Sequence, residues 1–385
     1  MREVAVLGIG QTQVDEHWGK SLKILAGEAA LAALQDAGVD RADGIFVGNM
    51  MSGSANHQQH LGAYLSDWIG LPQSESVHIE AACGSGAAAF RCALMAVASG
   101  QMNIALAVGV EKMTDSPGPE ITAELATAAD ADWEAGQGLS FVALNALIMR
   151  RYMWEFGWKH EHFAPFSINA HQNAIHNPFA RFQEPLTEQG YQKAPMIADP
   201  INLMDASPMG DGAAAVLLVP VERLKRLDQS PLVKVIASSA ATDTISIQNR
   251  RDATWLTAAE KSARDAYSQA GISPKEISLF ELHDAFTIMA ALSLEAAGFS
   301  ERGQAPRLAM NGEIKPSGKI PISTRGGLKA RGHPVGATGI YQIVEVVQQL
   351  RGLAGETQVP GARYGMAQNI GGSGSNIFVH ILEAC

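Results

Sequence analysis

Charged side chains are scarce in this sequence, and the basic ones are nowhere concentrated. Asp, Glu, Lys and Arg make up 18% of the 385 residues, the formal net charge is −10, and no run of Lys or Arg exceeds two residues. Binding of nucleic acid needs a concentrated basic surface, so the composition disfavours that function. Hydrophobic residues reach 46%. A homo-oligomer that buries part of each subunit against another copy would account for the high share of hydrophobic residues and the low share of charged ones.

Cysteine is also rare. The three cysteines, Cys83, Cys92 and Cys385, cannot all pair and do not have the spacing of metal ligands. No apolar run reaches the length of about 20 residues that a membrane helix needs, and Val4–Ile9 is too short for the apolar part of a signal peptide. The sequence therefore predicts a cytoplasmic protein with no membrane partner and no bound metal.

Cys83 stands where a strand-like segment turns through small residues into a helix. Gly84 and Gly86 permit a tight turn and a close approach of substrate atoms, and Ala87–Ser99 consists mainly of good helix formers. At a helix N-terminus, free N–H groups and the helix dipole stabilise a thiolate, which favours a nucleophile. A free cysteine among alanines is also commonly a small buried hydrophobe. Taken alone, this stretch leaves both interpretations open.

Apolar strand-like segments alternate with helix-like segments along the first part of the chain. The expected strands are Glu3–Gly10, Gly44–Gly48, Val77–Ala81 and Ile104–Val110. A helix is expected over Leu22–Ala37, with its apolar residues on one face and Gly38 as its stop. This alternation predicts an α/β fold with a largely parallel sheet that is covered on both faces.

The chain divides into two halves, predicted at residues 1–230 and 231–385. Residues 115–205 depart from the α/β pattern because they contain half of the tryptophans and no clear strand. We interpret this segment as a loop domain, inserted in the first half, that shapes a binding surface.

The second half repeats features of the first. Asp36–Phe46 and Ser268–Phe280 share a helix end, a glycine, a turn, an acidic residue and a strand, in the same order. Ala330–Gly339 again passes through glycines into a helix, with His333 at the place that Cys83 has in the first half. An internal duplication would bring the N-termini of two helices together and predicts a thiol–imidazole pair.

Five ordered motifs, covering essentially the whole chain, resemble those of the thiolase superfamily. They are the Cys83 turn, Met209–Ala215, His283–Phe286, Gly326–Ala337 and Asn369–Gly374. The His283–Phe286 motif is most similar to that of archaeal-type and sterol-carrier-type thiolases. The resemblance implies a five-layered αβαβα fold of two similar halves and a homodimer or homotetramer. Because archaeal-type relatives often work beside a small OB-fold, zinc-ribbon protein, it also allows such a partner.

The resemblance implies a role for each candidate site residue. Cys83 would attack the carbonyl of an acyl-CoA after His333 takes its proton, and His283 would join His333 in polarising the thioester oxygen of the second substrate. The backbone N–H groups of Cys83 and of the Gly371–Gly372 turn would hold the oxyanion.

Most thiolases carry a second cysteine that removes the α-proton of acetyl-CoA. The two positions where relatives place it are Asn369 and Ala285 in this sequence. An amide cannot act as a base at neutral pH, although Asn369 could orient a water or His283. His283, His333 and the unloaded Cys83 therefore remain as alternative bases.

The expected function is that of an acetyl-CoA C-acetyltransferase or a related thiolase that makes or cleaves a 3-oxoacyl-CoA. Its substrates would be coenzyme A thioesters, and no bound cofactor is expected. Lys329 and Arg331 either meet the phosphates of CoA or form a solvated turn. Two alternatives are a thiolase-fold lyase that cleaves a C–C bond by retro-aldol chemistry and a non-catalytic acyl-CoA-binding subunit.

Overall fold

A sheet of nine strands runs through the protein, whose computed structural model describes residues 1–224 and 231–385. The first half supplies five strands in the spatial order β3-β2-β4-β7-β1, and the second half continues with β8-β11-β10-β9. β1 pairs with β8 over only Val4–Val6, so the two halves are joined at a short seam. The strands are β1 (Val4–Gln11), β2 (Gly44–Gly48), β3 (Glu75–Ile79), β4 (Ala105–Glu111), β7 (Gly212–Pro220), β8 (Val233–Thr242), β9 (Leu279–Glu281), β10 (Tyr364–Gly371) and β11 (Asn376–Ala384).

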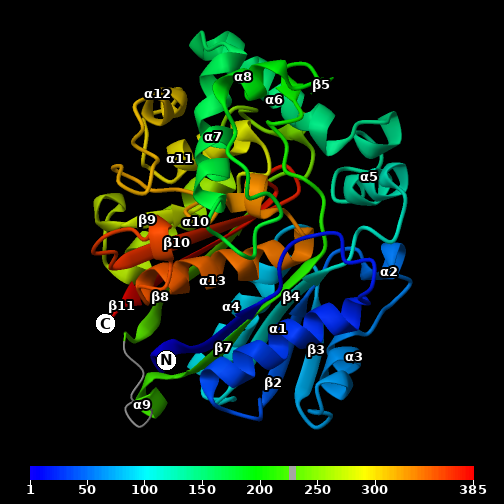
Figure 1. The fold of residues 1–385 in the computed structure, drawn as a ribbon, viewed down its shortest axis with the longest axis vertical. Coiled ribbons are helices and arrows are strands. Elements are labelled where there is room, and N and C mark those ends of the chain that lie inside the picture. Colours follow the sequence, from blue (N-terminus) through cyan, green and yellow to red (C-terminus); the bar gives the residue numbers. More distant parts are fainter. Residues whose placement is uncertain (225–230) are drawn as a thin grey trace.

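Three helical layers enclose the two halves of the sheet (Figure 1). α1 (Leu22–Ala37) and α3 (Leu61–Trp68) cover the outer face of the first half, while α10 (Thr257–Ala270) and α11 (Thr287–Ala296) cover that of the second. α4 (Ser85–Ala98) and α13 (Thr338–Leu350) pack against each other in the middle and contact strands of both halves. This is the five-layered αβαβα fold expected from the sequence, which is thereby confirmed.

The expectation of a largely parallel sheet is wrong. Only β2–β3, β2–β4 and β9–β10 are parallel among the described strands, and the remaining neighbours are antiparallel. β7 returns from the inserted segment rather than from a crossover helix, and it runs antiparallel between β4 and β1. β10 and β11 form a hairpin across the glycine-rich turn at residues 372–375. Local sequence does not reveal the direction from which a strand enters a sheet.

The segment at residues 115–205 lies above the core in Figure 1 and is mainly helical. Its helices are α5 (Gly118–Ala126), α6 (Phe141–Phe156), α7 (Ala164–Ala174) and α8 (Glu188–Lys193). It also contains a small hairpin of β5 (Met196–Ala198) and β6 (Ile201–Asn202), which the sequence did not indicate. The short helices elsewhere are α2 (Ser52–Ala55), α9 (Val221–Leu224) and α12 (Ala305–Met310).

The predicted boundary between the halves, at residues 230 and 231, adjoins residues 225–230, which lie outside the described part of the chain. It therefore stays a prediction. Within the ranges that the structure describes, no helix is both long and apolar enough to cross a membrane.

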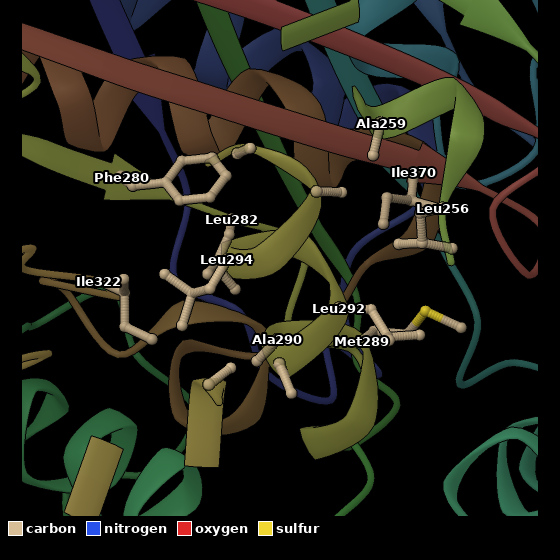
Figure 2. Close-up of a cluster of buried hydrophobic side chains, with 14 of the residues drawn as sticks. Leu256, Ala259, Phe280, Leu282, Met289, Ala290, Leu292, Leu294, Ile322 and Ile370 are labelled. Carbon is tan, nitrogen blue, oxygen red and sulfur yellow. The ribbon is translucent and has the colours of Figure 1, made fainter. Parts of the chain in front are cut away.

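The core of the second half supports the segment that carries the His283 motif. Figure 2 shows Leu282, which precedes the motif, beside Leu294 of α11, and Leu292 of α11 beside Met289; Phe280 belongs to the same cluster. Ile370 of β10 belongs to the same cluster and also reaches the cavity described below. The motif is thus anchored on both sides by buried apolar side chains, which hold it in a fixed position.

Candidate active site

Cys83, His283 and His333 converge from three separate elements. Cys83 precedes α4, His283 follows β9, and His333 precedes α13. The sulfur and one nitrogen of each ring all lie within 4.8 Å of one another. The two imidazole rings meet edge to face, with centroids 5.0 Å apart. The structure therefore brings the two halves together at the thiol–imidazole pair expected from the internal repeat, with a second imidazole beside it.

Two glycines allow the starts of the central helices to touch. A Cβ at Gly86 would lie 2.8 Å from the carbonyl oxygen of Gly336, and a Cβ at Gly339 would lie 2.4 Å from the backbone nitrogen of Ala87. Any larger residue would push α4 and α13 apart. These close approaches place the turn of Cys83 against the turn of His333.

His333 is held as one tautomer by its neighbour on α13. Its Nδ1 lies 2.7 Å from Oγ1 of Thr338, and that hydroxyl donates to the carbonyl oxygen of Pro334 at 3.2 Å. With the hydroxyl proton assigned to Pro334, Thr338 accepts from the ring, and Nδ1 carries the proton. Nε2 of His333 is then unprotonated and can accept the proton of a thiol.

His283 is held as the opposite tautomer. With its amide nitrogen assigned toward the ring, Asn369 donates from Nδ2 to Nδ1 of His283 at 3.0 Å. Nδ1 is therefore the acceptor, and Nε2 carries the proton. Asn369 is 1% exposed and lies on β10. In these assignments the two imidazoles differ in what Nε2 offers: a lone pair in His333 and an N–H in His283.

Burial keeps the resting site uncharged. It raises the pKa of Cys83 to about 12, helped by the negative charge of Glu111, and lowers the pKa of His333 well below its ordinary value. Burial also lowers the pKa of His283 to about 3. Cys83 adjoins the start of α4 as expected from the sequence, two residues before Ser85, and the nearby N–H groups lower its pKa, but the loss of water raises that pKa by more.

The backbone around Cys83 supplies hydrogen-bond donors. The N–H groups of Cys83 and Gly372 lie close enough to the sulfur to lower its pKa. Gly371 ends β10, and a Cβ there would lie 2.5 Å from the carbonyl oxygen of Ala81. The Gly371–Gly372 turn therefore packs directly against the cysteine turn, where the sequence placed candidate oxyanion donors.

Glu111 is a buried carboxylate that the sequence analysis missed. Its oxygens accept from the N–H groups of Met50, Met51 and Gly336 at 2.9 to 3.0 Å and from Nδ2 of Asn49 at 2.8 Å. Burial raises its pKa to about 7. Through these hydrogen bonds, Glu111 connects the first half of the protein to the turn that carries His333. A lone acidic residue directly after the apolar segment Ile104–Val110 was the signal that could have found it.

A cavity of about 380 Å³ opens onto Cys83, His283 and His333. Its walls are mainly apolar, and much of one wall comes from the inserted segment. Lining residues from that segment include Leu125, Phe141, Val142, Ile197, Leu203 and Met204. Phe286, Met289 and Ile370 line the cavity from the second half. An apolar cavity with a few reactive groups at one end suits a small organic substrate.

Lys329 and Arg331, the two candidates for binding the phosphates of CoA, lie in different surroundings. Lys329 is 2% exposed and lines the cavity, where its Nζ donates to the carbonyl oxygen of Asp205. Arg331 is completely buried; its Nε donates to Glu345 at 2.9 Å and its guanidinium stacks on Tyr341. The expectation that Arg331 meets CoA phosphates or forms a solvated turn is wrong, because its charge is paired inside the core.

Comparison with known proteins supports the thiolase resemblance over the full length of the chain. The family model "Thiolase, N-terminal domain" matches residues 4–222, and "Thiolase C-terminal domain-like" matches residues 239–384. The acetyl-CoA acetyltransferase of Methanothermobacter thermautotrophicus is 46% identical over 385 residues, which is 100% of both chains. Human sterol carrier protein 2 is 29% identical over 97% of this chain and 71% of its own length.

A solved structure, the Ltp2-ChsH2(DUF35) aldolase, is also similar. One of its chains matches with a TM-score of 0.86 and 26% identity, and the match covers 99% of this chain and 98% of that one. The archaeal and sterol-carrier relatives were both expected from the His283–Phe286 motif. Both family models and the full-length relatives therefore show that the chain belongs to the thiolase family and is a thiolase-type acyltransferase.

Proposed function

We propose that the protein condenses acetyl-CoA with an acyl-CoA, or cleaves a 3-oxoacyl-CoA with CoA, through an acyl group on Cys83. The observation that carries this proposal is the cluster of Cys83, His283 and His333 within 4.8 Å at the end of an apolar cavity. The name of the archaeal relative supports acetyl-CoA as one substrate. Because the thioester is already activated, this chemistry requires no metal.

In the proposed first half-reaction, Nε2 of His333 accepts the thiol proton as the sulfur of Cys83 attacks the acyl carbonyl carbon. The C–S bond to CoA breaks, and CoA leaves as a thiol with that proton. The N–H groups of Cys83 and Gly372 are placed to stabilise the tetrahedral oxyanion. Losing one such donor typically raises the barrier by about 3 kcal/mol.

In the proposed second half-reaction, a second thioester occupies the site with its carbonyl oxygen toward Nε2–H of His283. That donor stabilises the enolate that forms when the α-proton leaves. The carbanion then attacks the acyl group on Cys83. Retro-aldol chemistry, suggested by the name of the solved aldolase, would not require an acylated thiol, and the pairing of Cys83 with His333 favours the acyl-enzyme route.

The test is intact-protein mass after mixing with acetyl-CoA, with cleavage of acetoacetyl-CoA plus CoA followed in parallel. We expect one acetyl adduct on the wild-type protein, none on Cys83→Ala, and cleavage of acetoacetyl-CoA. Cys92→Ala is the matched control, because Cys92 lies on α4 outside the cluster. Cleavage that persists in Cys83→Ala would overturn the proposal.

We propose that Lys329 binds a carbonyl oxygen of the substrate. Burial lowers its pKa to about 8, so it is still mostly a cation at pH 7. Lys329→Met is expected to raise KM for the thioester by about tenfold, the typical effect of losing a hydrogen bond from a charged group, with little change in kcat. Steady-state kinetics would measure both, with the exposed Lys315→Met as control. An unchanged KM would contradict the assignment.

We also propose a homodimer or homotetramer. β3 is an edge strand of the sheet, and its Val77 is 40% exposed, which supports association along this edge. Analytical ultracentrifugation would test this, and a monomer at micromolar concentration would contradict it. The name of the solved Ltp2-ChsH2(DUF35) aldolase contains two components, which supports a partner such as a small OB-fold, zinc-ribbon protein. Full activity of the purified chain alone would show that no partner is required.

A further inference from the structure

The second half-reaction needs a base, and the described structure places no second thiol at the site beside Cys83. Asn369 and Ala285 occupy the positions where relatives were expected to carry that thiol. We propose that His333 is the base in both half-reactions and that His283 serves only as a hydrogen-bond donor. This inference rests on the proposed acyl transfer through Cys83 and assigns the proton transfers within it.

His283 is unsuited to act as the base because Asn369 donates to its Nδ1. The ring proton therefore lies on Nε2, the nitrogen left to face Cys83 and the substrate. To accept an α-proton there, the imidazole would first have to give up its own proton. Its burial within the apolar cavity wall, with only 3% exposed, also opposes the imidazolium that a second proton would create.

His333 has the opposite arrangement, and one nitrogen can serve twice. Nε2 takes the proton of Cys83 and gives it to the departing CoA sulfur, so the imidazole is neutral again when the second thioester binds. Nε2 then takes the α-proton, and the new C–C bond forms as the bond between the acyl carbon and Cys83 breaks. The departing thiolate of Cys83 recovers this proton from Nε2. The cycle balances, because each proton that His333 accepts is returned to a sulfur.

The other titratable groups near the cavity are engaged elsewhere. Nζ of Lys329 donates to Asp205, and Nδ1 of His171 lies 3.2 Å from the carbonyl oxygen of Glu184. His171 lies outside the cluster of Cys83, His283 and His333. Burial lowers the pKa of Lys329 to about 8, so at pH 7 it is mostly a cation and has no lone pair to accept a proton. Both oxygens of Glu111 accept from surrounding N–H groups, and its side chain does not line the cavity. Cys83 itself carries the acyl group at this stage. His333 is therefore the group with an available lone pair.

The test is exchange of the α-protons of acetyl-CoA with D₂O, followed by mass spectrometry, in a Cys83→Ala background that cannot be acylated. Glutamine is introduced separately at each histidine, because it keeps an N–H donor and cannot act as a base. We expect exchange in Cys83→Ala. We expect His333→Gln to reduce it by at least about a hundredfold, as for loss of a general base, and His283→Gln to reduce it by less than about tenfold.

Three results would overturn the proposal: exchange lost already in Cys83→Ala, a larger loss in His283→Gln than in His333→Gln, or equal losses in both. Acetylation of the wild-type protein tests the acyl-transfer step separately, so failure of that step and failure of this inference are distinguishable. Circular dichroism of each variant establishes that it is folded.

Asn369 acts through His283 and is therefore a positioning residue. Asn369→Asp replaces the donor with an acceptor, which should move the proton of His283 from Nε2 to Nδ1. We expect the ¹⁵N chemical shifts of the His283 ring to exchange their protonated and unprotonated values, and deuterium exchange to fall by at least about tenfold. Unchanged ring shifts with unchanged exchange would contradict this role. A purely structural role would change neither ring tautomer.

Discussion

Substitution of His333 by alanine is expected to slow acylation of Cys83 by about 10²- to 10⁴-fold at pH 7, the range for loss of a general base. Burial raises the pKa of Cys83 to about 12. A thiol with that pKa is ionised in only ~1 molecule in 10⁵ at pH 7. Without an adjacent base, acylation must depend on this small population.

Substitution of His333 by alanine should also change how the rate of Cys83 acylation depends on pH. A thiolate is the form present above the pKa, so below about pH 12 its fraction rises tenfold for each pH unit. Acylation of His333→Ala should therefore rise almost tenfold per unit between pH 7 and 9. The wild-type rate should change much less. Burial lowers the pKa of His333 well below its ordinary value, so its imidazole is already neutral between pH 7 and 9.

Rapid-quench measurement of CoA release, with acetyl-CoA as substrate, would give both rates. His171→Ala is a suitable control, because His171 lines the cavity but lies outside the cluster around Cys83. A pH-independent rate in His333→Ala, or a loss of less than tenfold at pH 7, would contradict the assignment of His333 as the base for Cys83.

Substitution of Arg331 by methionine is expected to destabilise the protein by about 3 to 5 kcal/mol, as is typical when one partner of a buried ion pair is removed. Arg331 and Glu345 are 0% and 1% exposed, and their side chains are joined at 2.9 Å. Without Arg331, the carboxylate of Glu345 would remain buried close to Glu281, whose pKa burial and the charge of Glu345 already raise to about 8. The carboxylate of Glu345 would then take up a proton, or the core around it would unfold locally and admit water.

Urea denaturation at pH 7 would measure this loss of stability. The double variant Arg331→Met with Glu345→Met should recover part of it, because no unpaired charge is then buried. The KM for CoA separates this structural role from phosphate binding. If Arg331→Met raised KM for CoA strongly while leaving the free energy of unfolding unchanged, the phosphate interpretation discarded above would be correct.

Local features of the sequence located several elements closely. Strand β2 was expected at Gly44–Gly48 and helix α1 at Leu22–Ala37, and both are found there. α4 begins at Ser85 rather than Ala87. Apolar runs, helix-forming residues and a glycine stop depend on neighbours within a few residues, so these signals can be recognised without the fold.

Features that depend on distant residues were harder to recognise. Glu111 binds N–H groups from Met50, Met51 and Gly336, which are far from it in sequence. The antiparallel β7 enters the sheet only after the whole inserted segment. The short β5 and β6 strands have no apolar alternation of their own and pair only where the surrounding helices place them.

The sequence by itself determined the internal duplication, the five motifs of the thiolase family and the identity of the three clustered side chains. Only the tertiary structure decided their chemical states. The ring tautomers follow from Thr338 and Asn369, which reach the imidazoles from α13 and β10. The neutral thiol follows from burial between the two halves. Residue types establish which groups can react, whereas proton positions and pKa values depend on neighbours that only folding brings within a few ångströms.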